Sequence, residues 1–277
     1  MGRKFEGMKK IPFYKMQGSG NDFILIDNRR GILKGMNLRD LSIAVCNRHY
    51  SVGADGLIVI VPSRKADFKW QFFNADGSEA EMCGNGSRCV ARFAYLTKIA
   101  KKNMSFETLA GIIHAAVKKN AVTVQLARAS GLHMNIAVPL ESGTRIGHFI
   151  NTGVPHLVYL SKDLNSESVE GIGRDTRYHE LFRPAGTNVN FIQVTGPHCL
   201  RIRTYERGVE GETMACGTGA VAAALIAGTL GHVSSPVDVL TRGGDRLVVS
   251  FKREGEQLMD LHLEGVAEAV CEGNLFI

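Results

Sequence analysis

The sequence predicts an α+β fold with two pseudo-symmetric lobes, each a curved, mostly antiparallel sheet wrapped around a central helix. The main observation is a repeat. Cys83 in Met-Cys-Gly-Asn-Gly and Cys216 in Ala-Cys-Gly-Thr-Gly lie 133 residues apart in similar settings. Two pairs of glycines that precede apolar runs keep the same offset, and such a common offset indicates a duplicated unit. These pairs are Gly20 with Gly153 and Gly53 with Gly186.

The length of the chain is consistent with this duplication. A chain of 277 residues suits two domains of about 130 residues each. No low-complexity linker separates the halves. We expect an N-terminal lobe over residues 1–128, to which residues 266–277 return, and a C-terminal lobe over residues 129–265.

The elements of the first lobe follow from short apolar runs and the residues that bound them. Residues 23–27 are apolar and lie between turn-forming residues, which is typical of a strand. Leu41, Val45 and Arg48 have the spacing of one helix face. The sequence therefore predicts strands at 23–27, 57–61 and 68–73, a turn at 74–77, helices at 38–48 and 87–97, and strands at 112–117 and 121–126.

The second lobe repeats this order. Residues 220–227 have the composition of a helix without a polar side, and a helix that is apolar all round is buried. We expect this helix to be the centre of its lobe, as residues 87–97 are of theirs. The expected strands lie at 157–160, 189–194, 200–205, 238–240, 247–251 and 258–263.

The composition excludes several classes of protein. The net charge is +6, but no aromatic residues interleave with the basic clusters, so we expect no nucleic-acid partner. The longest apolar stretch, residues 220–230, is too short to span a bilayer, and no apolar segment of a secretory signal follows the first ten residues. We therefore expect a soluble, cytoplasmic protein without a membrane partner. Residues 1–10 have no evident function.

The two cysteine turns have the features of a catalytic site. Glycine allows the backbone to pass close to a ligand. The N–H groups at a helix N-terminus can bind a carboxylate and stabilise negative charge, and they favour the thiolate form of a cysteine placed there. A buried, inert thiol is the usual fate of a single cysteine. Two cysteines in matching turns instead predict one thiol on each side of a shared cleft, which suits proton removal and return on opposite faces of a carbon.

The remaining motifs give no sign of a cofactor. None of the six cysteines forms a Cys-x-x-Cys pair. His156 has no neighbour at the spacing of a second metal ligand, and Gly18-Ser19-Gly20 lacks the third glycine of a dinucleotide-binding loop. We therefore expect neither a metal nor an organic cofactor.

Seven blocks of the sequence, spread over almost the whole chain, closely resemble the diaminopimelate epimerase family. The pairing of Cys-Gly-Asn-Gly with Ala-Cys-Gly-Thr-Gly is the most specific part of this resemblance. The blocks are MQGSGNDF at 16–23, NADGS at 74–78, CGNGSRC at 83–89, GVPH at 153–156, GTNVNF at 186–191, YERGVE at 205–210 and ACGTG at 215–219.

The resemblance implies a cofactor-independent, two-base epimerase that converts LL-2,6-diaminopimelate to the meso isomer. Cys83 and Cys216 match the two bases, and His156 and Glu206 match the polar pair beside them. The turn residues that hold the α-carboxylate match Gly84, Asn85, Gly217 and Thr218. The side chains that bind the distal end of the substrate match Asn21, Asn74, Asn190 and Arg207, and Glu206 also belongs to the substrate-binding set. The implied partner is this small molecule, with a second copy of the chain in a homodimer.

Two positions depart from the family pattern. Some members carry Asn where this chain has Val154 and Gln where it has Gly56, and neither residue here can donate a side-chain hydrogen bond. Two rival functions remain open. One is a racemase of proline or hydroxyproline with the same fold, although Arg207 favours a substrate with a distal carboxylate. The other is a redox protein that uses a Cys83–Cys216 disulfide.

Overall fold

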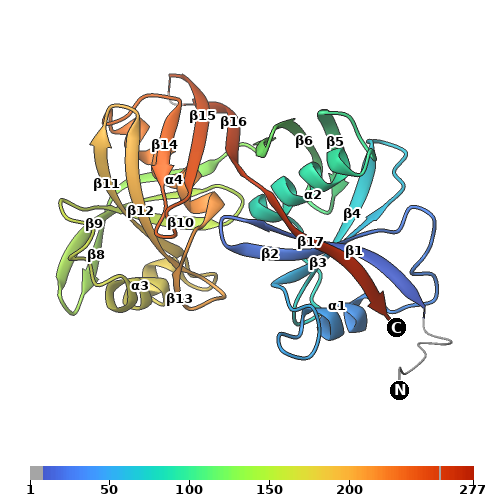
Figure 1. The fold of residues 1–277 in the computed structure, drawn as a ribbon. Helices are drawn as coiled ribbons and strands as arrows, with labels where there is room; N and C mark the ends of the chain where they lie inside the picture. Colours follow the sequence, from blue (N-terminus) through green and yellow to red (C-terminus); the bar gives the residue numbers. More distant parts are fainter. Residues whose placement is uncertain (1–8, 256) are drawn as a thin grey trace. The chain divides into compact units, whose positions relative to one another are not determined.

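The computed structural model describes residues 9–255 and 257–277, which form two compact units (Figure 1). The N-terminal unit contains the described residues up to Val124 together with Val266–Ile277, and the C-terminal unit contains Gln125–Gly265. Of the first ten residues, only Lys9 and Lys10 lie within the described part. The backbone of Lys9 is hydrogen-bonded to that of Ile277.

The N-terminal unit is one sheet with a helix on each face. Its strands lie in the order β17-β1-β2-β3-β4-β5-β6-β7. The pairs β2/β3 and β4/β5 are parallel and the other pairs are antiparallel. The strands are β1 Lys10–Gly18, β2 Asn21–Asp27, β3 Gly56–Val61, β4 Phe68–Asn74, β5 Asn103–Thr108, β6 Gly111–Lys118, β7 Ala121–Gln125 and β17 Glu268–Phe276, and the helices are α1 Leu38–Cys46 and α2 Gly84–Leu96.

Strands β2 and β3 are buried on both faces, which explains their unbroken apolar runs. Phe23 and Leu25 of β2 pack in the cluster that surrounds α2, whereas Ile24 and Ile26 pack with α1 on the other face. Figure 1 shows the two helices on opposite sides of these strands. A strand that is buried on both faces is apolar at every position, because successive side chains point to opposite faces.

The C-terminal unit repeats this plan. Its strands lie in the order β8-β9-β10-β11-β12-β14-β15-β16, with β13 paired to β12 as well. Again two pairs are parallel, β10/β11 and β12/β14. The elements are β8 Ser130–Leu140, β9 Gly143–Asn151, β10 Pro155–Leu160, α3 Val169–Arg177, the 3₁₀ turn Glu180–Phe182, β11 Asn188–Gly196, β12 Cys199–Glu206, β13 Gly211–Thr213, α4 Gly217–Thr229, β14 Val237–Leu240, β15 Arg246–Glu254 and β16 Gln257–Val266.

The predicted central helices are confirmed, but both begin earlier than expected. Helix α2 begins at Gly84 and α4 at Gly217, so each starts at the residue after its cysteine. The helix expected at 38–48 ends at Cys46. The sequence analysis did not predict β1, β5, β8, β9, β13, α3 or β17. No helix in the described ranges is long and apolar enough to cross a bilayer.

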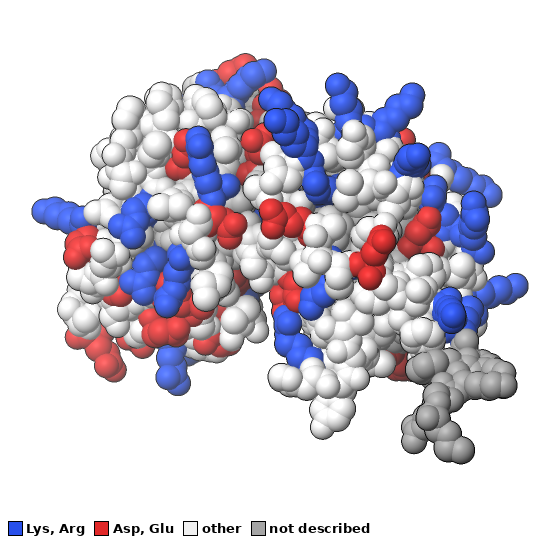
Figure 2. All heavy atoms as spheres, viewed as in Figure 1, with Lys and Arg blue, Asp and Glu red and all other residues white. Residues whose placement is uncertain are grey.

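The charged side chains of the described surface are mixed in sign. On the face shown in Figure 2, acidic and basic groups lie among one another over both units rather than in one basic patch. Several of them form exposed pairs, for example Arg29 with Asp27 and Lys252 with Asp260. Each such pair adds little stability, because water and salt screen exposed charges.

A close approach of α3 to β12 gives a test of the packing in the C-terminal unit. A Cβ atom at Gly173 would lie 2.5 Å from the Cβ of Tyr205, a distance at which the helix must move away. We therefore expect Gly173→Ala to lower the free energy of unfolding by about 1–3 kcal/mol, measured by urea denaturation. Gly171→Ala in the same helix is the matched control, since its Cβ meets only the hydroxyl of Ser168. Equal effects of the two substitutions would contradict this packing.

Candidate active site

Cys83 lies at the positive end of the central helix of the N-terminal unit. It is the N-cap residue of α2, in an extended conformation with φ −145° and ψ 123°, and its Sγ accepts a hydrogen bond of 3.4 Å from the N–H of Gly86. The N-cap position is usually held by Ser, Thr, Asp or Asn, whose side-chain oxygen accepts from the first turn. Here sulfur takes that place, so the thiol lies beside N–H groups that have no acceptor within the helix.

Two of the predicted asparagines contact this turn. The Oδ1 of Asn21 lies 3.7 Å from the Sγ of Cys83 and 3.4 Å from the Nδ2 of Asn85. Asn74 lies at the same end of the sheet, because it pairs with Gly56 and Gly56 pairs with Phe23. Its amide donates to Ser78 within its own turn, at 2.9 Å. The structure thus brings Asn21, Cys83 and Asn85 together and holds Asn74 on the same edge of the sheet.

Gly56 has no space for a longer side chain. A Cβ atom there would lie 2.6 Å from the ring of Phe72 and 2.8 Å from the carbonyl oxygen of Phe73. Where some family members carry Gln, this chain carries Gly56, and the glycine allows β3 to pack closely against Phe72 and Phe73 of β4.

Cys216 occupies the same position in the C-terminal unit. It is the N-cap residue of α4, its relative exposure is 6%, and its Sγ lies 3.5 Å from the Oγ1 of Thr218. Gly219 follows in the first turn, and a Cβ atom there would lie 2.5 Å from the Oδ1 of Asn190 and 3.3 Å from the sulfur. Only glycine allows α4 to begin this close to β11.

Glu206 ends β12 beside the thiol of Cys216. Burial raises the pKa of its carboxyl group, while contacts with Thr213 and Cys216 act in the opposite direction. An acidic group that holds its proton more tightly than usual, next to a thiol, is suited to exchanging a proton with it.

His156 and Asn190 form a buried pair behind this turn. Both side chains are fully buried, and the Nδ2 of Asn190 donates to the Nδ1 of His156 at 3.1 Å and to the carbonyl oxygen of Leu157. The hydroxyl of Thr204 donates to the Oδ1 of Asn190, which fixes the amide. The imidazole therefore carries its proton on Nε2, which has no hydrogen-bond partner within the described residues. Burial, and then the charge of Arg207, lower the pKa of His156 to about 3, so the ring is neutral.

Arg207 is held by its backbone and by its side chain. Its N–H donates to the Oδ1 of Asn188 at 2.8 Å, and its guanidinium donates to the carbonyl oxygen of Ala185 at 3.0 Å. Asn188, which the sequence analysis missed, also donates to the carbonyl oxygen of Pro155. It lies two residues before Asn190 on β11, so both amides point to one face of the strand. The spacing of two residues between Asn188 and Asn190 in a predicted strand could have indicated Asn188 as a site residue.

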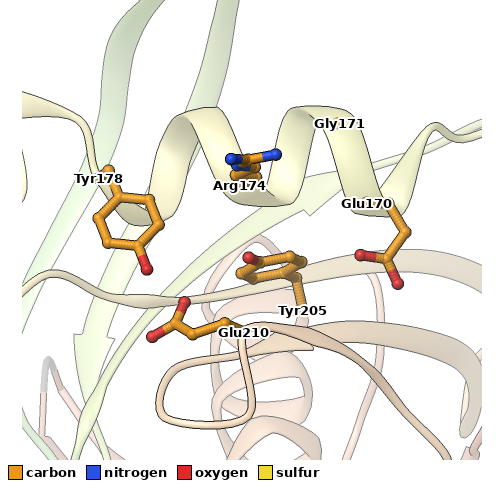
Figure 3. Close-up of a pocket in the computed structure, with 6 residues that line it drawn as sticks. All are labelled: Glu170, Gly171, Arg174, Tyr178, Tyr205 and Glu210. Atoms are coloured by element: carbon orange, nitrogen blue, oxygen red, sulfur yellow. The ribbon is translucent and has the colours of Figure 1, made fainter.

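The loop that carries Glu206 and Arg207 is fixed from outside by α3. Arg177 donates to the carboxylate of Glu210, whose Oε1 also accepts from the N–H of Gly208. Figure 3 shows α3 passing over the ring of Tyr205. A hollow of about 600 Å³ lies beside this helix. The hollow is lined by Glu170, Gly171, Arg174, Tyr178, Tyr205 and Glu210, none of which is a predicted site residue.

Comparison with solved structures defines the class of the fold. A phenazine biosynthesis protein of the PhzF family from Bacillus anthracis matches with a TM-score of 0.75 at 16% identity, over 98% of this chain and 100% of that one. A hydroxyproline epimerase from Agrobacterium vitis matches with a TM-score of 0.71 at 15% identity, over 100% and 94% of the two chains. At these identities the likeness concerns the fold, and it confirms the predicted α+β architecture.

The sequence comparisons identify the family within this fold. The diaminopimelate epimerase profile matches residues 13–131 and 148–267. A diaminopimelate epimerase of Hydrogenobaculum sp. is 49% identical over 94% of this chain and 97% of that protein. One of Aquifex aeolicus is 47% identical over 96% and 98%. The chain belongs to the diaminopimelate epimerase family, and the predictions of this family and of an epimerase are confirmed.

The buried imidazole makes stability depend on pH in the acidic range. The pKa of His156 is about 3 in the folded state and about 6.5 in the unfolded chain, so between these values the unfolded chain binds more protons. Stability is then lost as the pH falls from 6.5 towards 3, by up to about 1.4 kcal/mol per pH unit. We expect His156→Asn to flatten the unfolding free energy in this window, with the exposed His114→Asn as control. Parallel profiles for wild type and His156→Asn would contradict the assignment.

The carboxyl group of Glu206 has the opposite effect. Its pKa is raised in the folded state, so above pH 4.5 the unfolded chain loses this proton before the folded one does. Stability therefore falls as the pH rises through this range, and Glu206→Gln removes the loss. We expect the Tm of Glu206→Gln relative to wild type to increase as the pH rises above 4.5, by about 2–4 °C for each kcal/mol of stability that wild type loses. Glu254→Gln serves as the exposed control, and a constant Tm difference would disprove the effect.

Proposed function

We propose that the protein interconverts LL-2,6-diaminopimelate and meso-diaminopimelate, with Cys83 and Cys216 as its two bases. The observation that carries the proposal is that each unit places a cysteine as the N-cap of its buried central helix. The family of the chain supports the substrate. One thiolate removes the α-proton and the other thiol donates a proton to the opposite face, so that the number of protons on enzyme and substrate is unchanged. The mechanism requires both thiols to reach the same α-carbon.

The central difficulty of this reaction is the weak acidity of the α-proton. Negative charge that develops on removal of the proton passes to the α-carboxylate, which the backbone N–H groups of Gly84, Asn85, Gly217 and Thr218 can bind at the two helix N-termini. One well-placed donor of this kind contributes about 3 kcal/mol to a developing oxyanion. Donors fixed in a helix need no reorganisation as the charge forms, which is why a capping position suits the two bases.

The other predicted residues have supporting roles. Glu206, with its raised pKa, can supply a proton to Cys216 or accept one from it. Neutral His156 presents a proton on Nε2. We assign Arg207, Asn21 and Asn74 to the distal end of the substrate, where a guanidinium suits a carboxylate. Because Asn190 is fully buried against His156, we assign it to the orientation of that ring, and we add Asn188, which holds the backbone of Arg207.

Cellular context follows from this activity. Diaminopimelate is a precursor of lysine, so we assign the protein to lysine biosynthesis in the cytoplasm, with a small molecule as its partner and no nucleic acid or membrane. The mixed signs of the surface charges support this assignment. We also propose a homodimer, which analytical ultracentrifugation would test.

Substitution of either cysteine tests the two-base mechanism. We expect Cys83→Ala and Cys216→Ala each to lower kcat at least about 100-fold, because a positioned acid or base contributes that much or more. The assay measures epimerisation of LL-diaminopimelate, and deuterium incorporation in heavy water, with reductant and no added cofactor. Cys271→Ala, at an exposed position, is the control. Wild-type turnover in either active-site variant would rule out the mechanism.

A substrate panel separates this function from its closest rival. The same preparation is offered LL-diaminopimelate, L-proline and trans-4-hydroxy-L-proline. We expect turnover of the first alone, since Arg207 requires a distal carboxylate. Turnover of a cyclic substrate instead would favour the racemase function.

A further inference from the structure

A directional chain of hydrogen bonds passes beside Cys83 in the N-terminal unit. At one end the Nη2 of Arg88, a fully buried side chain, donates to the Oδ1 of Asn85 at 2.8 Å. The Nδ2 of Asn85 donates to the Oδ1 of Asn21 at 3.4 Å. The Nδ2 of Asn21 then donates to the Oδ2 of Asp55 at 2.6 Å. The chain thus begins at a cation and ends at an anion.

The two ends determine the orientation of both amides. A guanidinium only donates and a carboxylate only accepts, so Asn85 must turn its oxygen to Arg88 and Asn21 must turn its NH₂ group to Asp55. Each amide is left with one orientation. The Oδ1 of Asn21, an acceptor, is therefore the group that faces the Sγ of Cys83, at 3.7 Å.

Asp55 is an exposed residue that takes part in several hydrogen bonds. Its Oδ1 accepts from Arg48 at 3.0 Å, and its Oδ2 also accepts from the N–H of Asp22. The N–H of Asp55 donates to the carbonyl oxygen and to the Oδ1 of Asp22. These two residues directly precede the first pair of β2 and β3, Phe23 with Gly56. Lys15 and Arg48 balance the charge of Asp22. The carboxylate therefore presents a fixed acceptor to Asn21.

The orientation of Asn21 has a chemical consequence for the thiol. A carbonyl oxygen accepts the S–H proton but repels a thiolate, whereas the NH₂ group of a reversed amide would donate to the thiolate. The N–H of Gly86, at 3.4 Å on the helix side, acts in favour of the thiolate. A helix donor and a side-chain acceptor thus act in opposite directions on the protonation of Cys83.

We propose that Asp55 is a positioning residue that turns the oxygen of Asn21 towards Cys83, so that Cys83 is held as the protonated thiol before substrate binds. This inference deepens the proposed function and rests on it, because it gives Cys83 the proton-donating role at rest. Asp55 acts through Asn21 and needs no contact with substrate.

The test measures the reactivity of Cys83, since only the thiolate is alkylated rapidly. Initial rates of alkylation by iodoacetamide at pH 7 are followed by mass spectrometry of the peptide that contains Cys83, with the exposed Cys271 as internal reference. Asp55→Ala removes the acceptor that holds the Nδ2 of Asn21, so that this amide can turn away from its wild-type orientation. We expect the rate at Cys83 to rise about tenfold, which corresponds to one pH unit in the thiol equilibrium.

Two further variants separate orientation from the loss of charge or of structure. Asp22→Asn removes a charge from the same ionic cluster without touching the amide of Asn21, and we expect a rate within about twofold of wild type. The reciprocal variant Asn21→Asp/Asp55→Asn keeps the total charge and returns an acceptor to Cys83, so we expect its rate to fall back to the wild-type value or below.

Each outcome decides the proposal. An unchanged rate in Asp55→Ala, an equal rise in Asp22→Asn, or a rate that stays high in the reciprocal variant would overturn it. If Asp55→Ala does not fold, Asn21→Ala removes the acceptor that faces Cys83, and an unchanged rate there would overturn the proposal as well. Because the readout is alkylation rather than turnover, its failure is distinguishable from a failure of the proposed function, which the substrate assay detects.

Discussion

The structure depends on one constraint, that a thiol must sit at the start of a helix which is itself surrounded by sheet. A helix dipole acts strongly only where water is excluded, and α4 is buried along almost its whole length. The same burial leaves the N-terminal N–H groups as the polar part of an otherwise apolar element. The rest of each unit can be understood as the packing needed to bury such a helix together with its first turn.

Strand topology places the supporting residues at that turn. In both units a parallel pair, β2/β3 or β10/β11, lies beside the helix, and its polar residues occur where the strands begin or end. Asn21 and Asp55 meet at the start of β2 and β3, and His156 pairs with Asn188 at the start of β10 and β11. The duplicated plan thus provides two equivalent sets of positions, which the sequence fills with different side chains. Asn21 is an acceptor beside Cys83, while Glu206 is an acid beside Cys216.

Much of the fold could be predicted from the sequence because β2, β3 and β10 contain almost unbroken apolar runs and α4 lacks a polar side. Helix α3 could not be predicted. It contains Gly171 and Gly173, which lower helix propensity, and Gly173 is required by a close contact with Tyr205 that no local pattern reveals. The early starts of α2 and α4 were missed for a similar reason, since Gly-Asn-Gly and Gly-Thr-Gly read as turns.

The site residues likewise fall into those that the sequence predicts and those that it does not. The cysteines and their turns could be recognised because the motif is continuous in sequence and occurs twice. Asp55 and Asn188 could not, since Asp55 acts on a side chain 34 residues away and Asn188 acts through a backbone contact that exists only after folding. Asn190 could be recognised as a site residue from its sequence block, but its buried contact with His156 could not be predicted.

The pairing of β1 with β17 has a consequence for biosynthesis. Strand β1 emerges from the ribosome early, yet its neighbour on one side is made only after the whole C-terminal unit has been translated. Until then the nascent chain displays an unpaired sheet edge, the kind of surface that invites aggregation. The N-terminal unit therefore cannot be completed until residues 266–277 have been translated, which follows from the exchange of this one strand across the chain.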